Sequence, residues 1–512
     1  MELLSYTILF LISLVSTFLA LNFFSKTRAK TRHYPPGPLA LPIIGHMHLF
    51  GSSPHHALYN LAKRYGEIIS IRLGSVPYII VSSPEAAREF LRTHELAFAY
   101  RPQSIATRYL GYGGHGFAFA PYGPYWKFMK KLCMSELLSG RSLGNFLPIK
   151  REEIQGFLQL LSIASADNKS VNIGEELQLM VGNVIWRMSM SRRCSGNEGE
   201  AKEIRMLVND VSKLQIEFNI ADYIGFFRNI DLQGLGKRLE VTHQRFDKKM
   251  EEIVREHEEK KEKERGESVK DLMDILLEIS EDESADMKLT REHIKAFIRD
   301  IFGAGTATTA LGMEWTLAEL INNPRVLKKA RDEIDSVVGK HRLVQESDIL
   351  NLPYMQAIVK ETLRLHPTDP IILRESIQDC KINGYDIPAK SGVFINIWAV
   401  GRDPNHWENP LDFHPERFID ENGQTQIDLR GQHYHFLPFG SGRRGCPGTT
   451  LALQLIETTI AAMVQCFNLK IDGNGEEGGT VDMSEAPGLT LYRAQPLICL
   501  PVARLDPLPL VE

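Results

Sequence analysis

The spacing of hydrophobic and polar residues divides the chain into three regions. Between residues 57 and 91, short β-like runs at 68–72 and 78–81 lie among helix-like stretches, which predicts a small sheet near the N-terminus. From about residue 149 to 365, apolar residues recur at helical spacing with few turn signals, which predicts a largely helical middle region. The last third has turns rich in Pro, Gly and Asn, with short strands such as 392–396. We therefore expect a mainly α fold with small β-sheets.

A long uncharged stretch opens the chain. Residues 3–24 carry no charge, which is enough for a helix to cross about 30 Å of hydrocarbon. A basic cluster at 26–32 follows, whereas Glu2 is the only charge before it, so the positive-inside rule places the rest of the chain in the cytosol. A cleaved secretory signal is the alternative; it is disfavoured because no basic segment precedes the run. The expected divisions are a transmembrane anchor at 1–25, a basic and Pro-rich hinge at 26–38, and a cytosolic domain at 39–512.

Charge and cysteine usage exclude some classes of function. The net charge of −5 offers no basic excess for neutralising phosphates, so nucleic acid is not an expected partner. The six cysteines are scattered without a CxxC pair, which indicates free thiols in a reducing compartment. The mixed-charge run at 251–270 is interpreted as a solvated helix face or loop.

The segment 439–448 (FGSGRRGCPG) is the most informative one. Its four glycines and one proline predict a loop that bends tightly and lets its backbone approach a bound group closely. Cys446 lies there beside Arg444 and before an apolar helix expected at 451–467, an environment that predicts a lowered pKa of its thiol. A Gly-rich loop before a helix also suits a phosphate, but the Lys-Ser/Thr of a P-loop is missing.

This segment resembles the heme-binding signature of cytochromes P450, F-x-x-G-x-R-x-C-x-G. The signature is met by Phe439, Gly442, Arg444, Cys446 and Gly448. The resemblance implies the cytochrome P450 fold, with Cys446 as the axial ligand of the iron of heme b. It also implies a monooxygenase in the endoplasmic reticulum membrane, supplied with electrons from NADPH by NADPH–cytochrome P450 reductase.

Two further motifs imply a structural network. Glu361 and Arg364 are three residues apart on an expected helix, so both side chains lie on one face. They resemble the E-x-x-R of the family, and the segment 415–418 resembles the P-E-R-F motif that supplies Arg417. The resemblance implies that these three residues form a buried network behind the heme.

Other cations resemble the residues that contact the heme propionates. Trp126 and Lys130 match the family's W-x-x-x-R, with lysine in place of arginine. Lysine keeps the charge but loses the planar fork that binds carboxylates with two hydrogen bonds. Arg374 resembles another propionate partner. The alternative for these cations is a solvated surface position.

A glycine-bearing helix is expected at 294–320. Because glycine costs about 1 kcal/mol relative to alanine inside a helix, its presence there calls for a reason. The stretch resembles the oxygen-activating A/G-G-x-D/E-T motif, with Ala304, Gly305 and Thr308 matching and Ala307 at the acidic position. In the family the acid and the alcohol relay protons, which requires a titratable group. Ala307 leaves three possibilities: slower and less coupled activation, a proton route through water or a substrate hydroxyl, or unusual chemistry.

The substrate-facing stretches implied by the resemblance are mostly apolar, with Thr368 and Asp369 as polar candidates. The expected substrate contacts are Phe117, Phe119, Phe302, Ile371, Ile372 and Leu489. The chain resembles plant enzymes that include flavone and isoflavone synthases, pterocarpan hydroxylases and triterpene oxidases. This implies hydroxylation of a rigid hydrophobic plant metabolite, a flavonoid or isoflavonoid first and a pentacyclic triterpenoid second. A reductase-independent heme-thiolate isomerase or dehydratase, and a non-enzymatic heme-binding protein, remain the alternatives of another class.

Overall fold

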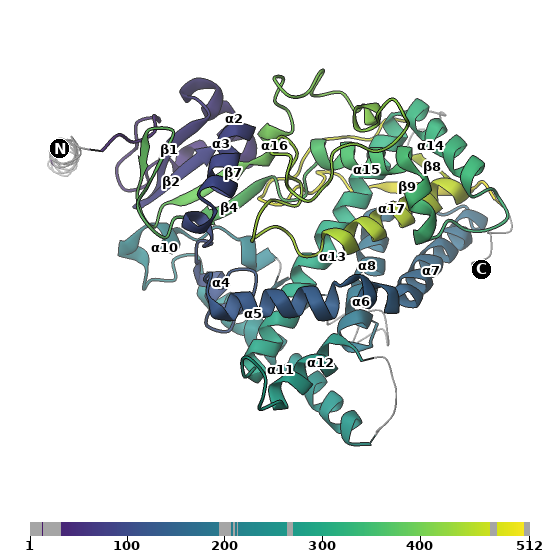
Figure 1. The fold of residues 1–512 in the computed structure, drawn as a ribbon, viewed down its shortest axis with the longest axis horizontal. Coiled ribbons are helices and arrows are strands. Elements are labelled where there is room, and N and C mark those ends of the chain that lie inside the picture. Colours follow the sequence, from purple (N-terminus) through teal and green to yellow (C-terminus); the bar gives the residue numbers. More distant parts are fainter. Residues whose placement is uncertain are drawn as a thin grey trace, which may run out of the picture.

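The larger sheet lies at one end of the molecule and most of the long helices at the other (Figure 1). The computed structural model describes residues 13, 32–193, 206–207, 210–211, 213–263, 270–471 and 479–505. The helices are α2 (Pro54–Tyr65), α3 (Pro84–Arg88), α4 (Ile105–Leu110), α5 (Pro124–Leu132), α6 (Gly140–Asn145), α7 (Leu147–Ala166), α8 (Ile173–Met190), α10 (Ile220–Tyr223), α11 (Leu235–Lys263), α12 (Leu272–Glu281), α13 (Arg291–Asn322), α14 (Pro324–Val337), α15 (Pro353–Leu365), α16 (Ile397–Val400) and α17 (Thr449–Cys466). The strands are β1 (Ile68–Leu73), β2 (Val76–Val81), β3 (Val171–Asn172), β4 (Ile371–Glu375), β5 (Cys380–Ile382), β6 (Tyr385–Ile387), β7 (Gly392–Asn396), β8 (Phe467–Ile471) and β9 (Ile498–Ala503).

The main sheet has the strand order β1-β2-β7-β4. β1 and β2 form an antiparallel hairpin, β2 pairs in parallel with β7, and β4 pairs antiparallel with β7. Alternate residues of β2 enter different clusters, since Ile79 and Val81 pack on one face and Tyr78 and Ile80 on the other. The sheet is therefore buried on both faces, which explains the short apolar runs in the sequence. Two smaller sheets pair β3-β9-β8 and β5-β6.

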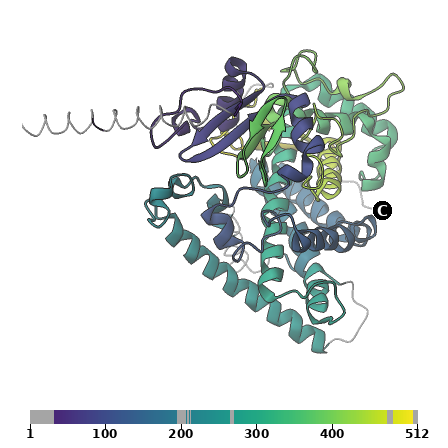
Figure 2. The same ribbon diagram turned by 60° about the vertical axis from the view of Figure 1, so that its left-hand side comes forward.

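Helix α13 runs through the centre of the molecule in both views (Figures 1 and 2). Thr290 caps its N-terminus, with its side chain accepting from the backbone N–H of His293. All residues from 309 to 320 are buried, because α8, α14, α15 and α17 pack around this half of the helix. Gly312 allows the close approach of Ile456 on α17, where a Cβ would come within 2.9 Å of the isoleucine Cδ1. The central helix therefore fixes the position of whatever its middle turns carry.

The mainly helical fold with small sheets, predicted from the pattern, is confirmed. The mixed-charge run lies on α11 as far as residue 263, and its residues 264–269 lie outside the described residues. Most residues from 251 to 260 are exposed or half-buried, although Ile253, Val254 and His257 are buried. Apart from Ser13, the expected anchor at 1–25 lies outside the described residues. None of the helices in the described ranges is both long and apolar enough to span a membrane.

The Pro-rich segment that precedes the sheet is docked against β1. Pro35 is buried, and the Pro36 carbonyl accepts a hydrogen bond from Ser70 N at 2.8 Å. A Cβ at Gly37 would collide with the carbonyl of Ser70, so only glycine allows this approach. The chain therefore enters the folded domain along the edge of the sheet.

Candidate active site

The loop that carries Cys446 is held by its own backbone. Cys446 N donates to Phe439 O, and Gly445 N donates to Gly442 O, both at 2.9 Å. Gly442 has a φ of +69°, and a Cβ there would collide with the Glu95 carboxylate. Helix α17 begins three residues after Cys446. The loop therefore presents the thiol in front of a helix N-terminus, as the sequence predicts.

The thiol itself differs from the prediction. Burial raises the pKa of Cys446 and outweighs the lowering by the Gly448 N–H and by Lys130. The lowered pKa predicted for this thiol is therefore wrong for the protein alone. The expected helper, Arg444, is engaged elsewhere, since it donates to the carbonyls of Ala99 and Ala120 at 2.8 and 2.5 Å and lies 4.4 Å from the centre of the Trp126 ring.

Several residues around the thiol face an internal cavity. Cys446 and Asp369 are exposed, yet burial is the main cause of the raised pKa of both groups. Groups that are accessible but poorly hydrated face an internal cavity rather than the outer surface. Ala304 of α13 is also exposed, and Thr308 Oγ1 donates to its carbonyl at 2.6 Å. Of the expected oxygen-activating residues, Ala304 is accessible on the central helix, whereas Gly305 and Thr308 are half-buried.

Four cations gather near Cys446 without carboxylate partners. Burial lowers the pKa of Arg374 well below its ordinary value, and repulsion from Arg101 and Arg444 lowers it further. Burial likewise lowers the pKa of Lys130, and repulsion from the same two arginines contributes to the lowering. Arg101 Nε and Arg444 Nη1 are buried without a hydrogen-bond partner. Among the described residues, no carboxylate forms an ion pair with any of the four, and Asp369 and Glu95 act on Arg101 and Arg374 only at longer range.

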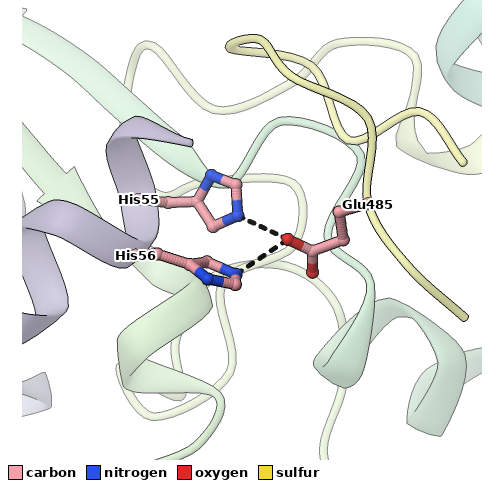
Figure 3. Close-up of side chains that lie close together, drawn as sticks. All are labelled: His55, His56 and Glu485. Carbon is pink, nitrogen blue, oxygen red and sulfur yellow. Dashed lines mark hydrogen bonds and ion pairs between the residues drawn. The ribbon is translucent and has the colours of Figure 1, made fainter. Parts of the chain in front are cut away.

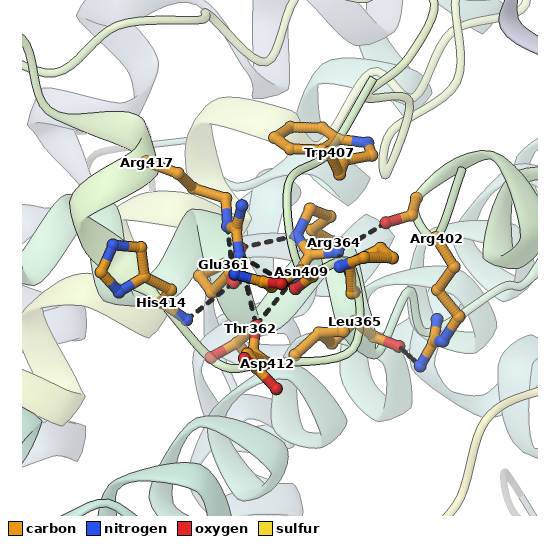
Figure 4. A network of polar contacts seen from close by, with 12 residues as sticks. Glu361, Thr362, Arg364, Leu365, Arg402, Trp407, Asn409, Asp412, His414 and Arg417 are labelled. Carbon is orange, nitrogen blue, oxygen red and sulfur yellow. Dashed lines mark hydrogen bonds and ion pairs between the residues drawn. The ribbon is translucent and has the colours of Figure 1, made fainter. Parts of the chain in front are cut away.

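Figure 4 shows the opposite case, a buried carboxylate whose partners are complete. Glu361 of α15 accepts from Arg364 Nε at 2.6 Å and Nη2 at 2.8 Å, and from Arg417 Nε at 3.0 Å. The backbone N–H of His414 donates to it as well, at 2.8 Å. The guanidinium of Arg364 also donates to the carbonyls of Gly401, Pro410 and Asp412. The helix residues and Arg417 of η7 (Pro415–Phe418) are brought together as the sequence motifs imply.

Comparison with known proteins decides the family. The family model described as Cytochrome P450 matches residues 35–496. The chain belongs to the cytochrome P450 family. It is 50% identical to the 3,9-dihydroxypterocarpan 6A-monooxygenase of Glycine max over 98% of this chain and 99% of that protein. It is 47% identical to the beta-amyrin 24-hydroxylase of Glycine max, over 98% of each chain. It is 42% identical to the 2-hydroxyisoflavanone synthase of Glycyrrhiza uralensis, over 93% of this chain and 92% of that protein.

This P450 is therefore a monooxygenase that uses heme b and electrons from NADPH, delivered by a reductase partner. The residues around Cys446 fit that cofactor. A heme b carries two propionates. These anions would pair with the buried cations whose nitrogens have no hydrogen-bond partner. Lys130 Nζ donates to Gly445 O at 3.2 Å, so this cation lies against the cysteine loop. The sequence missed Arg101, since it lies in no motif that the resemblance identified.

The expected substrate contacts of this P450 lie in different surroundings. Phe117 is 7% exposed and stacks on Trp126 at 5.9 Å between ring centres. Ile371 and Leu489 meet in the cluster under the sheet, while Ile372 and Phe119 are half-buried. Phe302 is 1% exposed and stacks on Trp186 of α8 at 4.5 Å, so it packs α13 on α8 and offers no accessible surface to a substrate.

Proposed function

We propose that this P450 hydroxylates a rigid, hydrophobic plant metabolite, with a flavonoid or isoflavonoid as the first candidate. The observation that carries the proposal is the 50% identity, over nearly the whole length of both chains, to a protein named for its action on a pterocarpan. The relative named as a 2-hydroxyisoflavanone synthase supports the same class. Half-buried apolar side chains such as Phe119, Ile372 and Leu489 suit a flat polycyclic scaffold.

Each site residue has a proposed task. Cys446 holds the heme iron, while Arg101, Arg374 and Lys130 neutralise the propionates. Heme b held by a thiolate supplies the cleavage of dioxygen and the insertion of one oxygen atom into the substrate. Thr308 orients a water molecule, and the small side chain of the accessible Ala304 leaves room for it. Gly305 instead allows the close approach of Ile185 of α8.

The proton route is the unusual part of this proposal. Ala307 has no titratable group, so protons reach the site through Thr308 and water or through a hydroxyl of the substrate. Asp369 is a carboxyl that acts electrostatically on Cys446, and burial raises its pKa, so we consider it a candidate member of the proton route.

A pentacyclic triterpenoid is the second candidate substrate. The relative named as a beta-amyrin 24-hydroxylase, 47% identical, specifically favours it. A reductase-independent isomerase or dehydratase is the alternative of another class; the oxygen-binding groove favours the monooxygenase, and Ala307 weakens that point.

The experiment expresses the full chain in microsomes with a P450 reductase and NADPH, against a panel of flavonoids, isoflavonoids and triterpenes. A mass gain of one oxygen on a flavonoid or isoflavonoid supports the first candidate, and on a triterpene alone the second. Product that forms without reductase would instead indicate the isomerase or dehydratase. The Cys446→Ser variant is the control: we expect it to lose turnover and to shift the Soret band of the reduced carbon monoxide form.

We also propose that residues 1–25 anchor the enzyme in the endoplasmic reticulum membrane as a single span, with the domain at 39–512 in the cytosol. The uncharged stretch at 3–24 and the basic residues after it support this placement. Alkaline carbonate extraction of microsomes tests it. The full chain should stay with the membrane pellet, and a variant lacking residues 1–25 should be released to a greater extent.

A further inference from the structure

Residues 485–493 form a short hairpin in which Leu489 is a proposed substrate contact and the other residues have no assigned role. Ala486 N donates to Tyr492 O at 2.8 Å, and the backbones of Glu485 and Arg493 form an antiparallel β-bridge across the two arms. Gly488 lies at the turn with a φ of +145°, a conformation that residues other than glycine rarely adopt. The hairpin therefore has a defined tip, at about residues 487–490.

The tip of this hairpin borders the cavity. Leu491 N donates to Thr368 O, and Leu491 O accepts from Trp315 Nε1 of α13, both at 2.8 Å. Next to it, Thr490 Oγ1 lies 3.5 Å from Asp369 Oδ1. Leu489 packs in the same cluster as Ile371, two residues after the accessible Asp369, so the tip lies in the wall of the cavity that Asp369 faces.

The base of the hairpin is held by Glu485, as Figure 3 shows. Glu485 Oε2 accepts from His55 Nε2 at 2.7 Å and from His56 Nε2 at 2.8 Å, both at the start of α2. Its second oxygen accepts from Trp398 Nε1 of α16 at 3.1 Å. Although burial raises the pKa of Glu485, these donors lower it to about 2, so the carboxylate is charged at neutral pH.

The geometry favours a hydrogen-bonded cluster, with Nε2–H donors, over a metal site. Two imidazoles and a carboxylate would suit a divalent transition metal ion. Each Nε2 would then lose its proton, and a neutral ring would carry it on Nδ1. His55 Nδ1 is buried without a hydrogen-bond partner, so a proton there would be unsatisfied. Arg402, whose guanidinium lies 3.9 Å from the centre of the Trp398 ring, adds a positive charge near the carboxylate.

We propose that Glu485 is a positioning residue for substrate binding: by fixing the base of the hairpin to α2 and α16, it sets the position of the tip in the cavity wall. Gly488 N donates to Ser52 O at 3.0 Å, so the start of α2 supports the tip directly as well. The inference rests on the proposed function in one respect, that this cavity receives the substrate. It adds that substrate affinity and the site of hydroxylation depend on a cluster at the far end of the hairpin.

The test compares full-length holoenzymes carrying Glu485→Ala, Glu485→Gln and Asp271→Asn. Asp271 is the matched control, because it forms a similarly buried pair with His257 at 3.1 Å in the α11–α12 region, and asparagine keeps its cap on α12. The first readout is the affinity for 4-phenylimidazole, followed by the shift of the Soret band. The second is KM, kcat and product position with any substrate found in the panel.

We expect Glu485→Ala to weaken 4-phenylimidazole binding and raise KM by about tenfold, the size of one lost charge-assisted hydrogen bond. The kcat should change less than KM. The affinity and KM of Glu485→Gln should lie between those of the wild type and Glu485→Ala, and Asp271→Asn should bind 4-phenylimidazole as the wild type does. Equal azole affinity and an unchanged product pattern in Glu485→Ala would overturn the inference. So would an equal loss in the Asp271→Asn control, since it would indicate general destabilisation. The azole titration needs no turnover, so it distinguishes failure of this inference from failure of the proposed substrate class.

Discussion

Two clusters of buried charge in this P450 differ in how completely the protein satisfies them. In the α15 network, the Glu361 carboxylate accepts from two guanidiniums and a backbone N–H, and the side chains of Glu361 and Arg364 are fully buried. Around Cys446, the buried guanidiniums of Arg101 and Arg444 each keep an unpartnered nitrogen. The hydrogen bonds of the first cluster are completed within the chain, whereas the cations of the second cluster repel one another.

This difference separates folding from cofactor binding. A complete buried network is costly to break, because removing one member leaves the others charged and unpaired. A cluster of buried cations without an anion destabilises the protein alone, but it binds a dianionic group strongly. We therefore expect the α15 network to maintain the fold of this P450, and we propose that the cations near Cys446 bind the heme propionates. Substitutions in the two clusters should have effects of different kinds.

The largest effect is expected from Glu361→Gln. The amide cannot neutralise Arg364 and Arg417, so the free energy of unfolding should fall by about 3–5 kcal/mol, the usual cost of breaking a buried ion pair. Urea denaturation of the holoenzyme, followed by circular dichroism, measures the change. The matched control is Asp332→Asn, which breaks the exposed pair of Lys328 and Asp332 on α14 and should cost less than about 0.5 kcal/mol. Similar losses in the two variants would contradict the distinction.

The second effect concerns the cofactor and should be smaller. Arg374→Met replaces a buried cation with an apolar side chain of similar length. The Arg374 guanidinium donates a hydrogen bond to the carbonyl of the neighbouring Leu373. We expect faster loss of heme, by a factor corresponding to about 1.5–3 kcal/mol for one hydrogen bond to a charged group. Heme transfer to excess apomyoglobin measures this rate.

The effect of Arg374→Met on the stability of the heme-free protein provides a second test of the comparison. Because repulsion from Arg101 and Arg444 is relieved, the urea midpoint of heme-free Arg374→Met should equal or exceed that of the heme-free wild type. A lower midpoint together with normal heme retention would place Arg374 with the α15 network instead.

A third, smaller effect depends on pH. The pKa of Glu485 is lowered to about 2 from an ordinary 4.5, so the charged carboxylate stabilises the folded state above pH 4.5 and this contribution is lost as the pH falls towards 2. The stability difference between wild type and Glu485→Gln should be constant from pH 7 to pH 5 and should narrow below pH 4.5. Urea midpoints at a series of pH values measure it. A difference that stays constant down to pH 3 would show that the lowered pKa does not contribute.

The sequence predicted those parts of the molecule that depend on local pattern. Helical periodicity found α13 and α15, and the spacing of Glu361 and Arg364 placed both on one helix face. Prediction from the sequence failed for properties that depend on burial. The thiol of Cys446 was expected to have a lowered pKa, and desolvation, which no local motif reveals, raises it.

Contacts between residues that are far apart in the chain could not be predicted from the sequence either. Glu485 contacts His55 across 430 positions of the chain, and neither residue lies in a recognisable motif. The same holds for Arg101, which reaches the cation cluster only because the loop before α4 folds back beside Cys446.

The smallest effect tests whether the cavity lacks an acid that the reaction needs. Ala307→Asp adds a carboxylate to the turn of α13 that carries Ala304 and Thr308. The fraction of consumed NADPH that yields product should rise about twofold, well below the 10²–10⁴-fold typical of general acid–base catalysis, because Thr308 and water already supply a route. NADPH consumption and product formation are measured together, with Ala307→Asn as the uncharged control of equal size. If coupling is the same in all three enzymes, the acid at this position does not limit the reaction, and the proton comes from elsewhere in the cavity. Asp369, whose raised pKa favours the protonated form, would then be the first group to substitute.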